Sequence, residues 1–382
     1  MNFLNKKIGV LGGGQLGRML QEKALEYGVN LFFLDPDKDC PCSIFSQYYT
    51  QGSYKKYEDV VNFGKNLDCI TIEIEHVNIE ALEYLENQGV EIIPNTKSIK
   101  IIQNKALQKQ FYLDKNIPSS TFQIFDNEEI VNIDTSFYPF FQKSQKDGYD
   151  GKGVQYIANE NDLIKQLGVP SILEKAVDIK KELAITVAID SFKNLRLFPI
   201  CEMVFDEKLN LVDYLLAPAS ISKDEENTIN QIATDFINAT DSKGLFSIEF
   251  FLTHNNEILV NEAAPRAHNS AHYTIEACNI SQFEAQLQIL LELKLPEIKL
   301  KSNASMINVV GEDKYAGNPV VEGQDLFHTI PNFHFHLYGK KETKSGRKMG
   351  HITLLHHDLE QLKLNTQQVK SRFKLKGETY LD

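Results

Sequence analysis

The first 95 residues alternate short apolar segments with amphipathic ones. Apolar segments lie at 7–12, 29–35, 68–77 and 90–95. The spacing of apolar positions between them predicts helices over 15–27, 57–67 and 79–87. Such alternation is typical of parallel βαβ units, so we expect a Rossmann-like parallel-sheet domain over residues 1–95.

The pattern changes after residue 95. Residues 96–116 have a helical pattern that stops before a proline, and strands and glycines up to residue 170 predict a small lid. Residues 171–300 begin with a strand over 171–177, include a helix over 225–239 and end in a helix over 281–293. Residues 301–382 are strand-rich. We therefore expect an α/β chain in four parts: 1–95, 96–170, 171–300 and 301–382.

Composition narrows the function classes. The chain has 382 residues, 42% hydrophobic, with a net charge of −12, which argues against a general nucleic-acid binder. Five cysteines without a C-x-x-C spacing indicate reduced thiols. The N-terminus lacks the apolar core of a signal peptide, and no apolar run approaches membrane-spanning length. We expect a cytoplasmic protein with neither nucleic acid nor membrane as partner.

A glycine-rich turn follows the first apolar segment. In IGVLGGGQLGRML, Gly12, Gly14 and Gly17 fit G-x-G-x-x-G, and Asp35 ends the next apolar segment. This arrangement is typical of dinucleotide binding, so a nicotinamide oxidoreductase is one hypothesis. The βαβ series is, however, too short for a complete two-half dinucleotide fold.

Two acids lie on a predicted hairpin in LFSIEFFLTHNNEILVNEAAPR. If Asn255–Asn256 is a two-residue turn, Glu249 lies opposite Glu262 and Phe251 opposite Val260. Two carboxylates about 5 Å apart repel unless a positive group lies between them or one keeps a proton.

Three explanations of this pair are open. Mg²⁺ commonly takes one or two carboxylates together with substrate phosphates. An exposed hairpin with two solvated glutamates explains the pair equally well when it is considered alone. An acid pair of the glycosidase kind would leave the neighbouring polar residues without a role. Those neighbours, which favour a site, are Asn261, Arg266, His268, Asn269, Ser270 and His272.

Three further segments are suited to binding anions or nucleotides. The loop FQKSQKDGYDGKG carries Lys143 and pliable glycines that can approach phosphates. Glu174 ends an apolar strand, and Glu182 follows where an acid could take ribose hydroxyls. Arg347 and Lys348 follow a turn glycine. Each segment alone is more simply a flexible tip, a charged junction or a solvated basic turn.

Taken together, these motifs resemble the N5-carboxyaminoimidazole ribonucleotide synthetase family of the ATP-grasp superfamily, which acts in purine biosynthesis. The most specific stretch is NEAAPRAHNSAHYTIEACNISQFE, 261–284; GGGQLGRM, GYDGKG and GRKMGH agree in order and spacing. The resemblance implies an ATP-grasp fold with lid 96–170 and central domain 171–300. It also implies a homodimer that carboxylates 5-aminoimidazole ribonucleotide with ATP and bicarbonate through carboxyphosphate.

The resemblance implies the following roles. Magnesium, with manganese as a substitute, would be bound by Glu249 and Glu262. Catalytic roles would fall to Arg266, which would hold bicarbonate or carboxyphosphate, and to His268 and Lys143. ATP contacts would come from Lys105, Lys143, Gly148, Tyr149, Asp150, Gly151, Lys152, Gly153, Val154, Glu174, Lys175, Ala176, Val177, Glu182, Asn261 and Glu262. The ribonucleotide would meet Gln15, Leu16, Glu73, Tyr149, Asp150, His268, Asn269, Arg347 and Lys348.

Some positions depart from the family pattern. Met203 and Phe205 stand where many relatives carry Asn and His; Lys105 and Lys152 replace common arginines, and Ala271 replaces a glycine. Because the acid pair and the phosphate loop are intact, we expect an active enzyme. The alternatives are a formate-dependent ribonucleotide transformylase of the same superfamily and a nucleotide sensor without catalysis.

Overall fold

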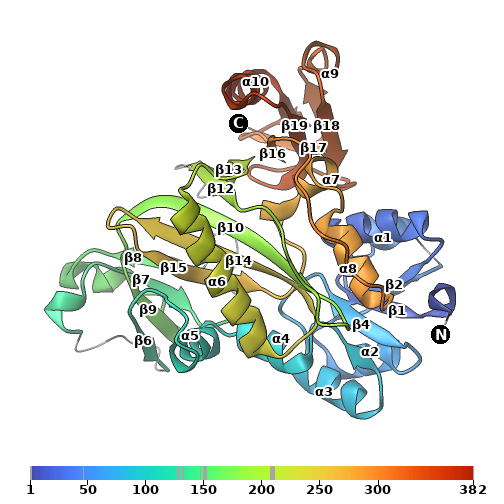
Figure 1. Cartoon of the computed structure of the whole chain (residues 1–382), viewed down its shortest axis with the longest axis horizontal. Helices are drawn as coiled ribbons and strands as arrows, with labels where there is room; N and C mark the ends of the chain where they lie inside the picture. Colours follow the sequence, from blue (N-terminus) through green and yellow to red (C-terminus); the bar gives the residue numbers. More distant parts are fainter. Residues whose placement is uncertain are drawn as a thin grey trace.

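The computed structural model describes residues 2–45, 47–126, 130, 133–146, 148, 153–206 and 211–381. Figure 1 shows an N-terminal domain, a lid, a long central sheet and a C-terminal region that extends from one end of that sheet. Among the described residues, no helix combines the length and apolar character needed to cross a bilayer.

The N-terminal domain is a parallel sheet in the order β3-β2-β1-β4-β5. Its strands are β1 (Ile8–Leu11), β2 (Leu31–Asp35), β3 (Tyr49–Gln51), β4 (Cys69–Ile72) and β5 (Glu91–Ile92). Its helices are α1 (Gln15–Glu26), α2 (Tyr57–Gly64) and α3 (Ile79–Asn87). The chain changes winding direction between β1 and β4, and ligands of such sheets bind outside the carboxyl ends at this point.

The helix predicted over 96–116 is two helices. They are α4 (Thr96–Ile102) and α5 (Lys105–Asp114). The helical conformation is interrupted at Asn104. The side-chain oxygen of Asn104 accepts hydrogen bonds from the amides of Ala106 and Leu107 and so caps α5. This cap makes Lys105 the first residue of α5.

The lid is a four-stranded sheet in the order β6-β9-β7-β8. Its strands are β6 (Phe122–Phe125), β7 (Phe140–Ser144), β8 (Val154–Ile157) and β9 (Ser171–Lys175). Strand β9 pairs with β6 and β7, although residue 171 is predicted to open the central domain.

One long sheet forms the centre of the molecule, in the order β15-β14-β10-β12-β13-β16-β19-β18, with β11 beside β10. The members before residue 300 are β10 (Ile179–Ile189), β11 (Leu195–Leu197), β12 (Cys201–Asp206), β13 (Leu211–Ala217), β14 (Gly244–Thr253) and β15 (Ile258–Ala264). The later ones are β16 (Ala304–Val310), β18 (Phe333–Leu337) and β19 (Lys348–Leu355). Because β13 pairs with β16, main-chain hydrogen bonds continue across residue 300.

Helices cover this sheet and join it to its neighbours. Helix α6 (Lys223–Thr240) crosses the face of β10 and β14 (Figure 1). The C-terminal region adds α9 (Leu326–Thr329), α10 (Leu359–Arg372) and the pair β17 (Tyr315–Glu322) and β20 (Lys374–Tyr380). Helix α10 lies in a region that the sequence pattern predicts to be strand-rich.

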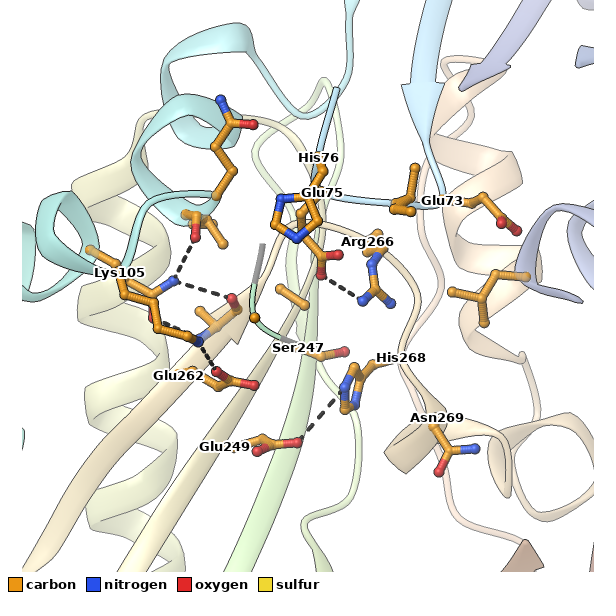
Figure 2. A pocket seen from close by; sticks show the side chains of 18 of the residues that line it. Glu73, Glu75, His76, Lys105, Ser247, Glu249, Glu262, Arg266, His268 and Asn269 are labelled. Atoms are coloured by element: carbon orange, nitrogen blue, oxygen red, sulfur yellow. Dashed lines mark hydrogen bonds and ion pairs between the residues drawn. The ribbon is translucent and has the colours of Figure 1, made fainter. Parts of the chain in front are cut away.

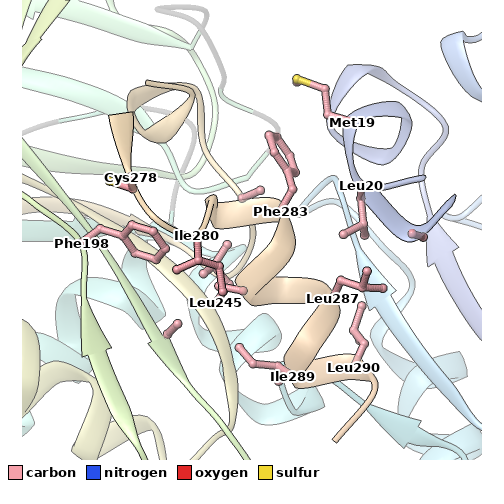
Figure 3. Close-up of a cluster of buried hydrophobic side chains, with 14 of the residues drawn as sticks. Met19, Leu20, Phe198, Leu245, Cys278, Ile280, Phe283, Leu287, Ile289 and Leu290 are labelled. Atoms are coloured by element: carbon pink, nitrogen blue, oxygen red, sulfur yellow. The ribbon is translucent and has the colours of Figure 1, made fainter. Parts of the chain in front are cut away.

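The N-terminal domain is held to the central sheet by apolar packing. Helix α8 (Gln282–Leu290), which follows the short α7 (Thr274–Ala277), lies between α1 and the strands of the central sheet (Figure 3). Leu287 and Leu290 point toward Leu20 of α1, and all three belong to one buried cluster with Leu245 of β14. This packing turns the carboxyl ends of β1 and β4 toward the β14–β15 hairpin.

We expect Phe236→Ala to destabilise the fold by about 3–5 kcal/mol, because truncation leaves a cavity in a close-packed core. Phe236 is fully buried, and its ring centroid lies 5.8 Å from that of Phe111 and 6.2 Å from that of Phe246. Denaturant unfolding measures the loss. The control, Phe192→Ala, removes a ring that is 61% exposed and should change stability by no more than about 0.5 kcal/mol. Equal losses in the two variants would contradict this core.

Candidate active site

A cavity of about 820 Å³ lies between the N-terminal domain, α5 and the β14–β15 hairpin (Figure 2). Eleven of the residues predicted to form the site line it: Gln15, Leu16, Glu73, Lys105, Gly148, Glu249, Glu262, Arg266, His268, Asn269 and Lys348. The cavity lies at the carboxyl ends of β1 and β4, as expected for a parallel sheet whose winding changes there.

The hairpin carries its acids on a register that differs from the prediction. The predicted two-residue turn at Asn255–Asn256 is wrong, because Thr253 and Glu257 close a three-residue loop. Asn256 has a φ of 61° and supplies the left-handed residue that such loops need. Phe251 consequently pairs with Leu259 and not with Val260.

A β-bulge then restores the predicted proximity of the acids. Ile248 pairs with Ala263 and Phe250 pairs with Val260, so both Asn261 and Glu262 lie opposite the single residue Glu249. The Asn261 side chain donates a hydrogen bond of 3.5 Å to Glu249 Oε2. The bulge therefore brings two adjacent polar residues to the same place as Glu249.

The acid pair meets both conditions under which neighbouring carboxylates can coexist. Lys105 Nζ lies 2.7 Å from Glu262 Oε2, and this positive charge lowers the pKa of Glu262. Burial raises the pKa of Glu249, and the neighbouring Glu262 charge raises it further. One carboxylate is thus neutralised by a lysine while the other favours its protonated form.

The donor set fits a hard divalent cation. Among the described residues, no group of three or more His, Cys, Asp and Glu side chains could hold a metal. Glu249 and Glu262 are hard oxygen ligands whose mutual repulsion a cation would relieve, and nucleotide phosphates and water would complete the coordination.

His268 is held as a neutral ring beside Glu249. Its Nδ1 accepts a hydrogen bond from the Ser270 amide, so we assign the ring proton to Nε2, which lies 3.7 Å from Glu249 Oε1 (Figure 2). Burial lowers the pKa of His268 to about 4, and the charges of Arg266 and Lys348 lower it further. At neutral pH this side chain is a hydrogen-bond donor.

The structure adds two residues that the sequence analysis missed, Glu75 and His76, which line the cavity next to Arg266 (Figure 2). Arg266 forms an ion pair with Glu75 and donates to the Ala267 carbonyl. Burial would raise the pKa of Glu75, but the Arg266 charge outweighs it and lowers the pKa. Both residues follow β4, which ends at Ile72 and not at 77 as predicted, so the position after a parallel strand is the signal that could have found them.

The side chain of Glu73, which follows β4, packs against the glycine-rich turn after β1. Its carboxylate accepts hydrogen bonds from the amides of Gly14, at 2.7 Å, and Gly17, at 2.6 Å. A Cβ on Gly14 would lie 2.4 Å from the Glu73 carboxylate, so this turn needs glycine there. Among the described residues, no partner takes the amides of Gln15 and Leu16, which lie between these two in the sequence; both residues line the cavity.

Asp35 also serves the turn itself. Its carboxylate accepts hydrogen bonds from the amides of Gly13, at 2.7 Å, and Asp37, at 2.8 Å. The nicotinamide hypothesis needs this acid to bind a ribose, so the arrangement argues against a dinucleotide.

Lysines and acids from the lid and from α5 meet beside the acid pair. Lys143 Nζ lies 3.1 Å from Glu174 Oε1 and donates to Asn261 Oδ1 at 3.2 Å.

The backbone amides after Glu174 are expected near the adenine of ATP. The amides of Lys175 and Ala176 donate to the carbonyls of Thr121 and Pro139, so they are not free to form hydrogen bonds with an adenine ring.

The remaining predicted residues differ in how far the structure describes them. Gly153 and Val154 lie at the start of β8, and Val177 follows β9. Arg347 donates to the Glu342 carbonyl and does not line the cavity, in contrast to Lys348. Tyr149, Asp150, Gly151 and Lys152 lie outside the described residues.

Glu182 lies between two apolar residues of the central sheet. On β10 it pairs with Met203 of β12 and with Phe251 of β14. Burial raises the pKa of Glu182 to about 7, and Lys143 opposes this increase. The carboxylate therefore titrates near neutral pH.

Comparisons with known proteins cover nearly the whole chain. Residues 110–283 match the ATP-grasp domain, 5–103 the ribonucleotide synthetase preATP-grasp domain, and 304–364 the phosphoribosylaminoimidazole carboxylase C-terminal domain. The N5-carboxyaminoimidazole ribonucleotide synthase of Staphylococcus epidermidis is 35% identical over 94% of this chain and 96% of its own length. The chain belongs to the N5-carboxyaminoimidazole ribonucleotide synthase family.

Solved structures agree with this assignment. The N5-carboxyaminoimidazole ribonucleotide synthetase of Thermotoga maritima matches with a TM-score of 0.89 and 35% identity over 98% of this chain and 100% of that one. The Aspergillus clavatus enzyme of the same family, solved with ADP and 5-aminoimidazole ribonucleotide, matches with a TM-score of 0.84 and 30% identity over 97% and 100%. Membership of the N5-carboxyaminoimidazole ribonucleotide synthase family replaces the nicotinamide hypothesis.

We expect Glu182→Gln to stabilise this family member at pH 8 more than at pH 4.5. Between the ordinary carboxyl pKa and about 7, the unfolded chain releases the Glu182 proton while the folded chain keeps it, so wild-type stability falls as pH rises through this window. A glutamine has no proton to lose. The difference in Tm between variant and wild type should therefore grow from pH 4.5 to pH 8, whereas the exposed Glu257→Gln should show no such growth. A difference that is constant with pH would contradict the raised pKa of Glu182.

Proposed function

We propose that this chain is an ATP-dependent ligase that carboxylates 5-aminoimidazole ribonucleotide to N5-carboxyaminoimidazole ribonucleotide in purine biosynthesis, with bicarbonate as co-substrate. The observation that carries the proposal is a single cavity joining the acid pair to the glycine-rich turn. One end is suited to a metal and a triphosphate, and the other offers backbone amides to a phosphate. The relative from Aspergillus clavatus, solved with ADP and 5-aminoimidazole ribonucleotide, supports the binding of both ligands by one protein.

ATP would lie between the lid and the central sheet. Lys105 and Lys143 would leave their carboxylate partners to contact the phosphates, and Glu182 would take a ribose hydroxyl. Glu249 and Glu262 would hold Mg²⁺, with Asn261 beside them. When bound, the metal supplies positive charge that stabilises the transferring phosphoryl group.

Bicarbonate would be held by Arg266. Its Nε is buried and has no hydrogen-bond partner among the described residues, which leaves a donor for an anion. A bicarbonate oxygen attacks the γ-phosphorus, the bond to the bridging oxygen of ADP breaks, and carboxyphosphate forms. Its carbon–oxygen bond then breaks to give CO₂ and phosphate, and the exocyclic amine of the ribonucleotide attacks the CO₂. The neutral His268 would donate from Nε2 to an oxygen of the anion.

The ribonucleotide would span the cavity. Its phosphate would be bound by the amides of Gln15 and Leu16 together with Lys348, and Glu73 would fix that turn while facing the ribose. His268 and Asn269 would lie near the base. The Asn269 side chain is held by a reciprocal pair of hydrogen bonds with Asn308, at 2.9 and 3.1 Å, so its position is set before the ligand binds.

The resemblance to the family extends the proposal to the setting of the enzyme. We propose a homodimer in the cytoplasm, with no nucleic acid or membrane as partner. The molecular mass in solution tests the first part of this statement.

Phosphate release tests the proposed activity. We expect release from ATP to require 5-aminoimidazole ribonucleotide and bicarbonate, with one phosphate per carboxylated product. Turnover with formate in place of bicarbonate would favour the transformylase alternative. Binding of ATP and ribonucleotide without any phosphate release would favour a sensor.

In the same assay we expect Glu262→Gln to lose turnover by roughly 100-fold or more, because the variant removes a charged metal ligand and leaves Lys105 without its partner. Glu257→Gln on the same hairpin is the control, since Glu257 is exposed and outside the cavity. Near-normal turnover by Glu262→Gln at an unchanged Tm would show that the metal is bound elsewhere.

A further inference from the structure

A third lysine lies beside the nucleotide end of the cavity and has no part in the proposed chemistry. Lys109 of α5 is 2% exposed and does not line the 820 Å³ cavity. Its ammonium lies 3.1 Å from Glu174 Oε2 and donates at 3.1 Å to the Ser120 hydroxyl, which in turn donates at 2.8 Å to the same Oε2. Lys109 is therefore too deep to reach a phosphate and is committed to one carboxylate oxygen.

The other oxygen of Glu174 faces a different lysine. Oε1 lies 3.1 Å from Lys143, which is 14% exposed at its side chain, while Glu174 itself is 4% exposed. One carboxylate thus lies between a deep lysine from α5 and a shallower lysine from the lid. Lys105 and Lys109 are one turn apart on α5, so one face of this helix supplies a cation to Glu262 and another to Glu174.

This arrangement decides what happens when Lys143 moves to a phosphate. A buried carboxylate that loses its only cation is strongly destabilised, and that cost would count against nucleotide binding. With Lys109 and Ser120 on Oε2, Glu174 stays paired when Lys143 leaves. The cost of moving Lys143 is then small.

We propose that Lys109 is a positioning residue for nucleotide binding: it is the permanent counter-ion of Glu174 and so leaves Lys143 free to move to the phosphates of ATP. The proposal rests on the proposed function only in that Lys143 contacts a nucleotide phosphate. A lysine of purely structural importance would lower stability and affect all ligands alike.

The first test is Lys109→Met. Without the deep cation, Lys143 becomes the only counter-ion of Glu174 and is held away from the phosphates. We expect the Kd for a non-hydrolysable ATP analogue with Mg²⁺ to rise roughly tenfold or more, since hydrogen bonds to charged groups are worth about 1.5–3 kcal/mol. The Kd for adenosine, which carries no phosphate, should change less than about twofold. Lys100→Met, which removes an exposed lysine of α4, is the matched control and should leave both constants unchanged.

The second test compares Lys109→Met in two backgrounds. In Glu174→Gln no buried carboxylate is left to hold Lys143, so the added Lys109→Met change should alter the Kd of the ATP analogue by no more than about twofold. This double variant keeps neither the Lys109 nor the Glu174 charge, and if Lys109→Met alone does not fold, a Kd for the double variant roughly tenfold or more above that of Glu174→Gln would still overturn the proposal. An equal effect in both backgrounds, or equal loss of adenosine and ATP-analogue affinity, would overturn the proposal.

These measurements need no carboxylation. Binding of the ATP analogue by a wild-type protein that does not carboxylate the ribonucleotide would refute the proposed function and leave the Lys109 comparison intact. Wild-type binding that is insensitive to Lys143→Ala would instead refute the Lys109 proposal at its starting point.

Discussion

Two carboxylates forced to face the same cavity set the conditions for the whole site. The bulge in β15 gives Glu249 both Asn261 and Glu262 as opposite neighbours, and the resulting repulsion must be offset. Lys105 neutralises one of the two carboxylates, Glu262. Lys105 is in place to do so because Asn104 caps α5 immediately before it. Charge thus connects the hairpin, the capped start of α5 and Lys143 of the lid. A triphosphate bound with a divalent cation is the class of ligand that can pair with these lysines and carboxylates in place of their present partners.

The glycine-rich turn shows how the same physical feature can be read in two ways. A helix N-terminus attracts an anion, and here a protein carboxylate, Glu73, already takes the amides of Gly14 and Gly17. The glycines are therefore needed for close packing against an internal acid as well as for a ligand. What remains for a ligand is the pair of amides between them, at Gln15 and Leu16. Asp35, which made a dinucleotide plausible, is likewise bonded to the turn.

The sequence allowed the alternation of strands and helices, the parallel N-terminal sheet and the proximity of Glu249 and Glu262 to be predicted, because these depend on local periodicity and on one hairpin. The register was wrong near the turn and correct at the acids, since a bulge cancelled the error of one residue. Bulges have no clear signal in a single sequence. The division of residues 96–116 into two helices could have been found from Asn104, a strong cap residue within a helical pattern.

The missed features depend on contacts between distant segments. Glu75 and His76 line the cavity because β4 ends at Ile72, earlier than its apolar pattern predicts. In the sequence, Lys109 is an ordinary lysine in a helical pattern. It meets Ser120 and Glu174, which are 54 residues apart along the chain, only because α5 packs beside β9. Such partnerships arise from tertiary packing, and periodicity alone does not predict them.

The central claim is that bicarbonate is the nucleophile toward ATP in this cavity, and the fate of its oxygen tests that claim most directly. With freshly dissolved ¹⁸O-labelled bicarbonate, ATP and 5-aminoimidazole ribonucleotide, the released phosphate can be examined by ³¹P NMR before the label exchanges with water. The account predicts that the phosphate carries one oxygen from bicarbonate, because the carbon–oxygen bond of carboxyphosphate breaks and the attacking oxygen stays on phosphorus. Phosphate without excess ¹⁸O would contradict it.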